Sequence, residues 1–296
     1  MVLHADERTV DADLVSRLLA EQLPHLAHLR PVAVDVQGSV NVVHRLGDGL
    51  CTRLPRRREY VQDLQSEVRW LAELSPHLTL AAPEVVALGR PGQGYPFPWA
   101  VYRWVEGVPY DDGLVDDEAR AARDLARFVE GLRRAGVPAG APSGGRAPLT
   151  TLAATTGAAV QACAPELGQD GVTALSHVWE QALGAPVWDG PGVWVHADLL
   201  PFNLTVRAGA LHGVLDFGSA GVGDPAADVI AAWTVFGPTG RAALRSALDV
   251  DRGTWERARG YALHQAADIV PYYRHSHPAF AAAAVRTLRR VLEPDR

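Results

Sequence analysis

The spacing of hydrophobic residues changes twice along this chain. Apolar side chains first recur at intervals of three and four over residues 10–29, and Asp11 or Asp13 can cap the start of such a helix. Short β-branched runs with partial alternation follow at 32–37, 41–46 and 50–54. Gly47-Asp48-Gly49 predicts a tight turn between the last two runs, and its middle residue can take a positive φ. An antiparallel meander is therefore expected in this region.

Helical periodicity returns after these strands and is interrupted once. One amphipathic helix is expected over 59–74, and a Pro- and Gly-rich stretch follows over 75–98. Residues 98–107 indicate one strong strand that leads into a turn. A clear amphipathic helix at 116–135 and a flexible Pro/Gly/Ala/Ser segment at 136–148 then begin a different region.

The rest of the chain has mainly helical character. Helices are expected near 149–163, near 171–184 and from about 226 to 292. Short apolar strands at 193–196 and 211–216 flank a loop. The pattern predicts an α+β protein in which a β-rich first third joins a mostly helical remainder near residue 105.

Composition and charge narrow the class of protein. The 296 residues carry a net charge of −6, and 48% are apolar, which is ordinary for a soluble globular protein. Nucleic-acid binders usually show a basic surplus, so nucleic acid is not expected as the main partner. The N-terminus lacks an apolar signal core and no apolar run suits a membrane span, so the cytoplasm is the expected location. No obligate protein partner is evident.

The basic and sulfur-containing residues add two constraints. All 28 basic residues are arginine, so any step that usually needs a lysine ammonium must use a guanidinium here. Cys51 and Cys163 are the only cysteines and lie far apart in the sequence. Neither a disulfide framework nor a cysteine-based zinc site is expected.

Two neighbouring segments carry a catalytic pattern. His196, Asp198 and Asn203 fit H-x-D-x-x-x-x-N, and Asp216-Phe217-Gly218 begins thirteen residues after Asn203. Phosphoryl transfer passes through a highly anionic transition state, so the protein mainly positions groups and neutralises charge. Asn203 and Asp216 offer oxygen ligands suited to Mg²⁺, and Asp198 can accept the proton of an attacking hydroxyl. A strand–loop–strand hairpin is expected to bring these side chains together.

With Gly223-Asp224-Pro225 and Asp228 behind them, these motifs resemble those of the aminoglycoside phosphotransferase family, a branch of the protein-kinase-like fold. The resemblance spans nearly the whole chain. It implies a bilobal fold with a small antiparallel-sheet N-lobe over 1–105 that binds nucleotide. A larger, mainly helical C-lobe over 106–296 would hold the catalytic loop and the acceptor. The resemblance also implies ATP or GTP with Mg²⁺ as cofactors, and a buried Asp228 that braces the catalytic loop.

The resemblance also assigns residues near the nucleotide phosphates. The loop that contains Ser39 and Asn41 is expected to cover the phosphates. Arg53 stands where relatives commonly have lysine, and Glu67 is its expected ion-pair partner. A guanidinium keeps the charge and can bind phosphate through two nitrogens, so function is expected to survive this replacement.

Four further positions near the proposed site also have expected roles. The carbonyl of Arg103 and the amide of Val105 are expected to bind the base in a hinge over 101–107. Because backbone atoms would recognise the base, the side chains in the sequence do not distinguish ATP from GTP. Ala197 stands where many relatives have glycine, and a methyl group there is compatible with a negative φ. His196 is expected to support the loop structurally and not to act as a base.

The acceptor is less defined than the chemistry. Carboxylates are sparse over 226–292, which favours a macrolide-like acceptor or a small metabolite over a polycationic aminoglycoside. The working hypothesis is O-phosphorylation of an antibiotic or natural product, and a kinase of an amino sugar or amino alcohol is an alternative. The sequence is also compatible with a catalytically silent nucleotide-binding protein, a metal-dependent hydrolase built on His196, Asp198 and Asp216, or an interaction module.

Overall fold

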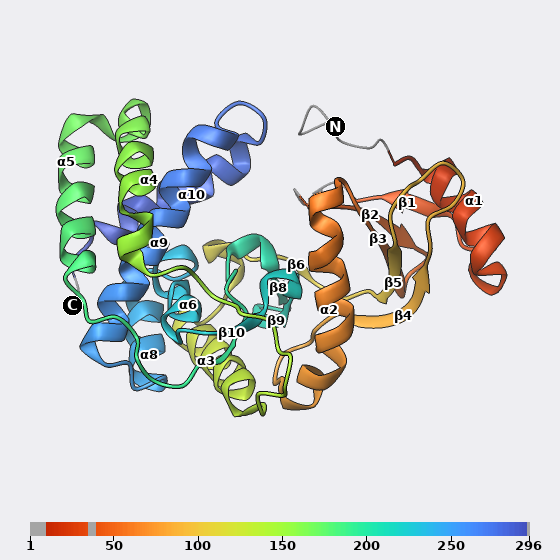
Figure 1. Cartoon of the computed structure of the whole chain (residues 1–296), viewed down its shortest axis with the longest axis horizontal. Helices are drawn as coiled ribbons and strands as arrows, with labels where there is room; N and C mark the ends of the chain where they lie inside the picture. The colour runs from red at the N-terminus through yellow and green to blue at the C-terminus, as the bar shows by residue number, and fades with distance from the viewer. Residues whose placement is uncertain (1–9, 35–39, 295–296) are drawn as a thin grey trace. The chain divides into compact units, whose positions relative to one another are not determined.

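The computed structural model describes residues 10–34 and 40–294, which group into two compact units (Figure 1). The first comprises Met1–Pro76, Ala82–Glu106 and Leu215–Gly218, and the second comprises His77–Ala81, Gly107–Val214 and Ser219–Arg296. His77–Ala81 therefore belongs to the second unit although residues of the first unit flank it in sequence. Leu215–Gly218 belongs to the first unit although residues of the second flank it. The lobe boundary placed after residue 105 stays a prediction.

The first unit is built on a five-stranded antiparallel sheet in the order β1-β2-β3-β5-β4. Its strands are β1 (Pro31–Ala33), β2 (Asn41–Leu46), β3 (Leu50–Pro55), β4 (Glu84–Gly89) and β5 (Trp99–Arg103). The runs predicted at 41–46 and 50–54 are confirmed as β2 and β3. Strand β4 was not predicted, since an edge strand with an exposed face lies between Pro- and Gly-rich segments.

Two details of this sheet differ from the sequence-based expectation. Only part of the run at 32–37 is strand β1, and residues 35–37 lie outside the described residues. In the β2–β3 turn the positive φ belongs to Gly47, at 56°, and not to the middle residue Asp48. Glycine suits this position because it has no Cβ to clash with the backbone.

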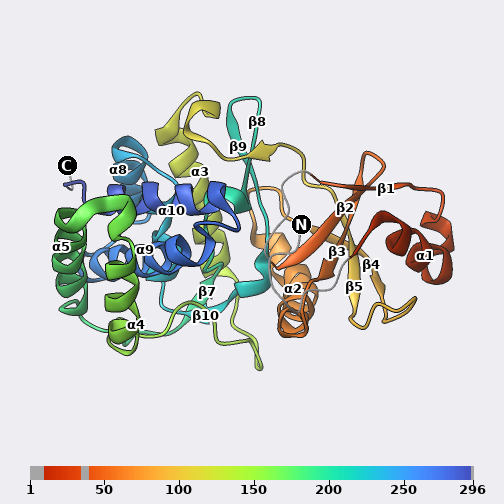
Figure 2. The ribbon, with the colours of Figure 1, turned by 90° about the horizontal axis from the view of Figure 1, so that it is seen from above.

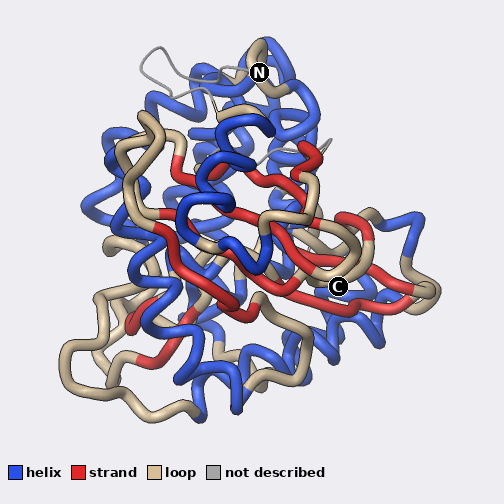
Figure 3. The backbone as a smooth tube through the Cα atoms, turned by 90° about the vertical axis from the view of Figure 1, so that its right-hand side faces the viewer, coloured by secondary structure: helices blue, strands red, loops and turns tan. Residues whose placement is uncertain are grey.

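Helices α1 (Ala12–Gln22) and α2 (Val61–Leu74) lie on opposite faces of this sheet (Figure 2). Helix α1 begins at Asp11, which accepts a hydrogen bond from the Leu14 amide at 2.8 Å. Leu18 and Leu19 of α1 pack with Leu54 of β3 in one apolar core, and Figure 3 shows this helix over the red strands. Successive strand residues point to opposite faces, so Arg53 points to the face that α2 covers.

The second unit is mainly helical. Its helices are α3 (Glu118–Arg134), α4 (Leu149–Ala162), α5 (Ala164–Leu183), α6 (Ala226–Val229), α7 (Ala231–Thr234), α8 (Pro238–Ala247), α9 (Arg252–Tyr273) and α10 (Pro278–Val291). Helix α9 is central, with contacts to α4, α5, α6 and α10 (Figure 1). In the described part of the chain, no helix combines the length and apolar character that crossing a bilayer requires.

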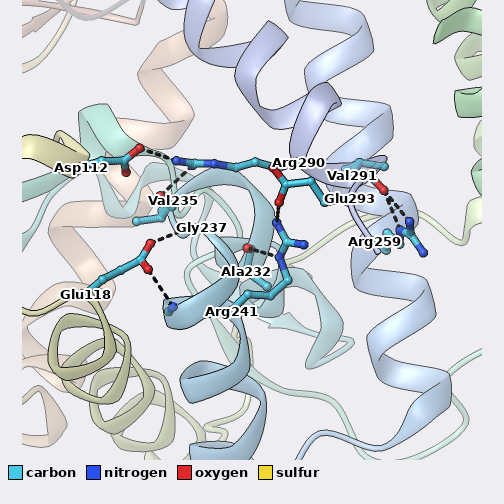
Figure 4. A network of polar contacts seen from close by, with 11 residues as sticks. Asp112, Glu118, Ala232, Val235, Gly237, Arg241, Arg259, Arg290, Val291 and Glu293 are labelled. Atoms are coloured by element: carbon cyan, nitrogen blue, oxygen red, sulfur yellow. Dashed lines mark hydrogen bonds and ion pairs between the residues drawn. The ribbon is translucent and has the colours of Figure 1, made fainter. Parts of the chain in front are cut away.

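Polar contacts join α3 to the start of α8, and α8 to the segment that follows α10 (Figure 4). The Glu118 carboxylate, at the start of α3, accepts hydrogen bonds from the backbone amides of Gly237 (2.5 Å) and Gly240 (2.9 Å). A carboxylate at the start of α8 satisfies free amides and interacts favourably with the helix dipole. Arg241 of α8 in turn donates to Glu293, beyond α10, at 2.9 Å.

The strands around the catalytic loop pair differently from the predicted hairpin. They are β6 (Val108–Pro109), β7 (Val193–Val195), β8 (Leu204–Arg207), β9 (Ala210–Val214) and β10 (Gly221–Gly223). Strand β7 pairs with β10, whereas β9 pairs with β8. Ala208 (φ 49°) and Gly209 (φ 74°) form a two-residue turn with both φ positive, as a type I′ hairpin turn requires. The expected pairing of 193–196 with 211–216 is therefore wrong.

The Pro- and Gly-rich segment 136–148, expected to be flexible, is held along strand β10. The Val222 amide donates to the Pro142 carbonyl at 2.8 Å, and the Gly144 amide donates to the Val222 carbonyl at 2.9 Å. A Cβ on Gly144 would lie only 2.2 Å from the Cα of Gly221, so these two segments can approach this closely only because both positions are glycine. Backbone pairing therefore orders a segment whose composition suggested a linker.

Both cysteines are buried in the structure, and neither forms a disulfide. Burial raises the pKa of the Cys163 thiol to about 11 and also raises that of Cys51. Because the thiolate is the reactive form, both side chains are expected to remain inert structural thiols.

Candidate active site

A buried carboxylate fixes the loop that follows strand β7. Asp228 of α6 is fully buried and accepts hydrogen bonds from the backbone amides of His196 (3.0 Å) and Ala197 (2.8 Å). Burial raises the pKa of the Asp228 carboxyl, although His196 and the two amide hydrogen bonds act in the opposite direction. Nδ1 of the buried His196 accepts a hydrogen bond from the Asp198 amide at 3.3 Å. These contacts fit the structural roles expected for Asp228 and His196.

Ala197 does not have the negative φ under which its methyl group would be readily tolerated. Its φ is 66°, in the left-handed region. This turn directs two successive amides toward the same carboxylate, that of Asp228. A left-handed conformation costs a residue with a Cβ about 1–2 kcal/mol. Packing of the methyl group with Val195 and Ala227 offsets part of that cost.

Removing the Asp228 side chain is expected to destabilise the fold. Asp228→Ala leaves the amides of His196 and Ala197 buried without an acceptor, at about 1–3 kcal/mol for each unpaired group. Urea unfolding should therefore show a loss of about 2–6 kcal/mol. Asp170→Ala, at an exposed position of α5, is the matched control and should change stability by less than about 0.5 kcal/mol. Equal stability of the two variants would contradict the bracing role.

The Asp198 carboxylate is held by two side-chain amides. Nδ2 of Asn203 donates to Oδ2 of Asp198 at 2.8 Å and to its backbone carbonyl at 2.9 Å. Nε2 of Gln265, on helix α9, donates to Oδ1 at 2.8 Å. A carboxylate oxygen can accept more than one hydrogen bond, so these contacts orient Asp198 and are compatible with a role as general base.

Gln265 and its partner Arg146 were not predicted from the sequence. The guanidinium of Arg146 donates to Oε1 of Gln265 at 2.9 Å and to the carbonyl of Ala197 at 3.0 Å. Both residues come from segments far from the catalytic motif in sequence, so spacing offers no signal for them. One weak cue exists, since Gln265 is a polar residue on a largely buried helix.

The oxygen atoms of Asn203 and Asp216 suit a magnesium ion. Because Nδ2 of Asn203 is the atom that donates to Asp198, its Oδ1 remains available as a ligand. Within the described residues, the Asp216 carboxylate forms no hydrogen bond or ion pair. Mg²⁺ prefers such carboxylate and amide oxygens and binds through one or two protein ligands plus phosphates and water. Asn203 belongs to the second unit and Asp216 to the first, so their shared role stays a prediction.

In the first unit, a buried ion pair joins the sheet to α2. Nη1 of Arg53 lies 2.9 Å from both carboxylate oxygens of Glu67. Burial alone would lower the pKa of Arg53, but Glu67 holds it above its ordinary value. Among the described residues no partner binds Nη2 of Arg53, so that nitrogen is available for a phosphate oxygen. Arg53 also packs over the Tyr102 ring, with Cζ 4.9 Å from the ring centroid.

The same ion pair is connected to the Asp-Phe-Gly turn. Oε2 of Glu67 accepts a hydrogen bond from the Phe217 amide at 2.9 Å. A Cβ on Gly218 would lie 3.1 Å from Cβ of Asp63 in α2, so glycine allows this close approach. Burial and the neighbouring Asp216 carboxylate raise the pKa of Asp63. Arg53, Glu67 and Asp216 are thus parts of one local arrangement.

The other predicted nucleotide-binding residues are placed as follows. Ser39 lies outside the described residues. Asn41 begins strand β2, and its Oδ1 is buried without a hydrogen-bond partner in the described chain. Arg103 ends strand β5, with its exposed side chain 2.8 Å from Glu84, and Val105 follows as a partly buried residue. Their contacts with nucleotide stay predictions.

Replacing Arg53 tests whether charge or guanidinium geometry matters. Arg53→Lys keeps a cation beside Glu67, so kcat/KM for nucleotide should stay within about tenfold of the wild type. Arg53→Ala leaves the Glu67 carboxylate buried without its partner and should cost about 3–5 kcal/mol of stability. Steady-state kinetics and urea unfolding of both variants measure these effects. A much larger kinetic loss in Arg53→Lys would show that phosphate binding needs the two-nitrogen geometry of arginine.

Comparison with protein families gives a match over most of the chain. The model described as the phosphotransferase enzyme family matches residues 13–261. The chain belongs to this family. It is therefore a phosphotransferase with an alcohol group as acceptor, as the catalytic motif predicted. Comparison with curated protein sequences gives no match.

Solved phosphotransferase structures share the fold. The GDP complex of wild-type aminoglycoside 2'-phosphotransferase-IIIa is similar with a TM-score of 0.76 at 18% identity, over 96% of this chain and 99% of that chain. Macrolide 2'-phosphotransferase type I is similar with a TM-score of 0.61 at 21% identity, over 97% of this chain and 99% of that chain. The apoenzyme of macrolide 2'-phosphotransferase MphH from Brachybacterium faecium has a TM-score of 0.57 at 24% identity, over 96% of this chain and 100% of that chain. These likenesses confirm the predicted α+β, protein-kinase-like fold of this phosphotransferase.

Proposed function

We propose that this phosphotransferase moves the terminal phosphate of ATP or GTP to a hydroxyl group of a mainly apolar natural product of the macrolide type. The observation that carries the proposal is the Asp198 carboxylate, which Asn203 and Gln265 hold beside an apolar, aromatic surface. A base for the hydroxyl and a surface for the rest of the acceptor thus occur together in the second unit.

In the proposed reaction Asp198 orients the acceptor hydroxyl and accepts its proton as the new O–P bond forms. Asn203 and Asp216 are the residues that would hold magnesium. Bound there, the ion would neutralise charge on the phosphate oxygens and orient the nucleotide. Arg53 adds a fixed positive charge, because its ion pair with Glu67 occupies Nη1 and leaves Nη2 for a phosphate oxygen.

We assign nucleotide binding to the N-terminal lobe, with its boundary near residue 105. Ser39 and Asn41 would cover the phosphates, and the carbonyl of Arg103 and the amide of Val105 would bind the base. Similar structures include GDP-, ADP- and ATP-bound phosphotransferases, which supports a nucleotide cofactor without selecting the base. Because ATP and GTP are intracellular substrates, the cytoplasm is the proposed location of this activity.

The surface beside Asp198 favours an acceptor with a large apolar face. Phe202 of the catalytic loop packs edge-on against Phe280 at 5.5 Å between ring centroids, and Phe280 lies 5.1 Å from Tyr273. A small recess here is lined mainly by apolar side chains, including Leu200 and Ile269, alongside two threonines and a glutamine. Such surfaces bind apolar bodies and sugar faces better than polycations.

Acidic side chains are few on this surface. Asp268, one residue from Ile269, lies 3.6 Å from Nε2 of His264 on the same helix. Binding of a polycationic aminoglycoside would call for several carboxylates that face the acceptor. The charge distribution therefore supports a macrolide-like acceptor. The TM-score is nevertheless higher for the GDP complex of the aminoglycoside enzyme (0.76) than for macrolide 2'-phosphotransferase type I (0.61).

Mass spectrometry of acceptors incubated with the enzyme, Mg²⁺ and ATP or GTP tests this proposal. The panel should contain macrolides, aminoglycosides, amino sugars and amino alcohols, with Asp198→Asn as the paired inactive enzyme. A gain of one phosphoryl group on a macrolide, absent with the variant, is expected. Modification of aminoglycosides alone would overturn the acceptor class. Nucleotide binding without transfer to any acceptor would instead favour a silent nucleotide-binding protein.

A further inference from the structure

Gln265 contacts the Asp198 carboxylate and also lines the apolar recess. It lies on α9, where its amide nitrogen is 2.8 Å from Oδ1 of Asp198. The recess beside it also includes Leu200 and Phe202 of the catalytic loop. This glutamine therefore lies at the junction between the proposed base and the proposed acceptor surface.

Arg146 determines which way the Gln265 amide points. A guanidinium can only donate hydrogen bonds, and an ionised carboxylate can only accept them. Oε1 of Gln265 must therefore face Arg146, at 2.9 Å, and Nε2 must face Asp198. Without Arg146, the amide could rotate by 180° and present its oxygen to the carboxylate. Arg146 thus excludes the repulsive orientation.

Arg146 is itself held in place by the surrounding chain. It follows the segment paired to strand β10, in which Gly144 lies against Gly221. The same guanidinium nitrogen that binds Gln265 also donates to the carbonyl of Ala197, the residue with left-handed φ. One cation therefore connects the catalytic loop and helix α9.

We propose that Arg146 and Gln265 are positioning residues that fix the Asp198 carboxylate for its reaction with the acceptor hydroxyl. This inference rests on the proposed function, in which Asp198 is the base. Asn203 restrains one carboxylate oxygen, and the Arg146–Gln265 pair restrains the other. With both oxygens restrained, the carboxylate plane is set before the acceptor binds. A base displaced by about 1 Å can lose on the order of 10²-fold in rate.

Gln265→Met is the direct test, because methionine matches glutamine in length and lacks the amide. It should lower kcat by about 10- to 100-fold and leave the KM for nucleotide unchanged. Gln161→Met, the same change at an exposed position of α4, is the matched control and should leave both parameters unchanged. A merely structural role would lower thermal stability without this separation of kcat from KM. Wild-type kcat in Gln265→Met would overturn the proposal.

A double-variant cycle distinguishes this inference from the proposed function. If Gln265 acts through Asp198, then Gln265→Met should cause no further loss of single-turnover rate in an Asp198→Asn enzyme. Arg146→Met should resemble Gln265→Met, and the two changes together should cost no more than one. Full additivity with Asp198→Asn would overturn the positioning role and leave the proposed function intact. Wild-type turnover in Asp198→Asn alone would instead overturn the proposed function.

Discussion

Asp198→Asn is expected to lower kcat by a factor on the order of 10²–10⁴ while nucleotide still binds. Asparagine keeps the shape of the side chain but cannot take a proton from the acceptor. Its NH2 group would also face one of the two amide donors, from Asn203 or Gln265, that now hold the carboxylate. Steady-state kinetics measures the loss, and calorimetry measures the Kd for nucleotide.

The control for this variant is Asp170→Asn, on the exposed side of α5, which should keep wild-type turnover. Asp198→Ala should be at least as impaired as Asp198→Asn, because it also removes the acceptor of two hydrogen bonds. If both Asp198 variants turn over like the wild type, another group must accept the proton, and the assignment of the base is wrong.

Asp216→Ala is expected to abolish Mg²⁺-dependent turnover. The Asp216 carboxylate is the one charged group in the proposed magnesium pair, since Asn203 contributes a neutral amide oxygen. Without it, charge on the transferred phosphate would lose its main counterion. Initial rates over a Mg²⁺ titration measure the effect, with stability followed in parallel.

Glu67→Gln helps to separate metal binding from packing near Asp216. Glu67 accepts the Phe217 amide hydrogen bond, and Gln can still accept that bond while it weakens the ion pair with Arg53. Glu67→Gln should therefore retain the Mg²⁺ dependence of the wild type at a lower rate. An unchanged Mg²⁺ dependence in Asp216→Ala would count against Asp216 as a ligand.

Local patterns in the sequence predicted the parts of the site that depend on local geometry. The family resemblance assigned Glu67 as the partner of Arg53, and their ion pair is present between the neighbouring elements β3 and α2. The Asp and Asn of the H-x-D-x-x-x-x-N motif lie together, as the Asp198–Asn203 contact shows. Such contacts follow from one element or from two adjacent ones.

The sequence was a poor guide where distant segments decide the geometry. Gln265 on α9 contacts Asp198 although the two residues are 67 positions apart in sequence. The turn at Ala197 depends on the Asp228 carboxylate of α6. The pairing of β7 with β10 was missed because Ala208-Gly209 is a weak turn signal, so β8 was taken for a loop. Each of these unpredicted features depends on a tertiary contact that residue spacing does not encode.

The most direct measurement of the central claim is a crystal structure with Mg²⁺, a non-hydrolysable nucleotide analogue and a phosphorylatable acceptor. The account predicts that Oδ1 of Asn203 and the Asp216 carboxylate bind the same ion at about 2.0–2.1 Å. It also predicts the Asp198 carboxylate within about 2.6–3.2 Å of the acceptor hydroxyl. An ion bound without these two residues, or an acceptor hydroxyl remote from Asp198, would contradict the account.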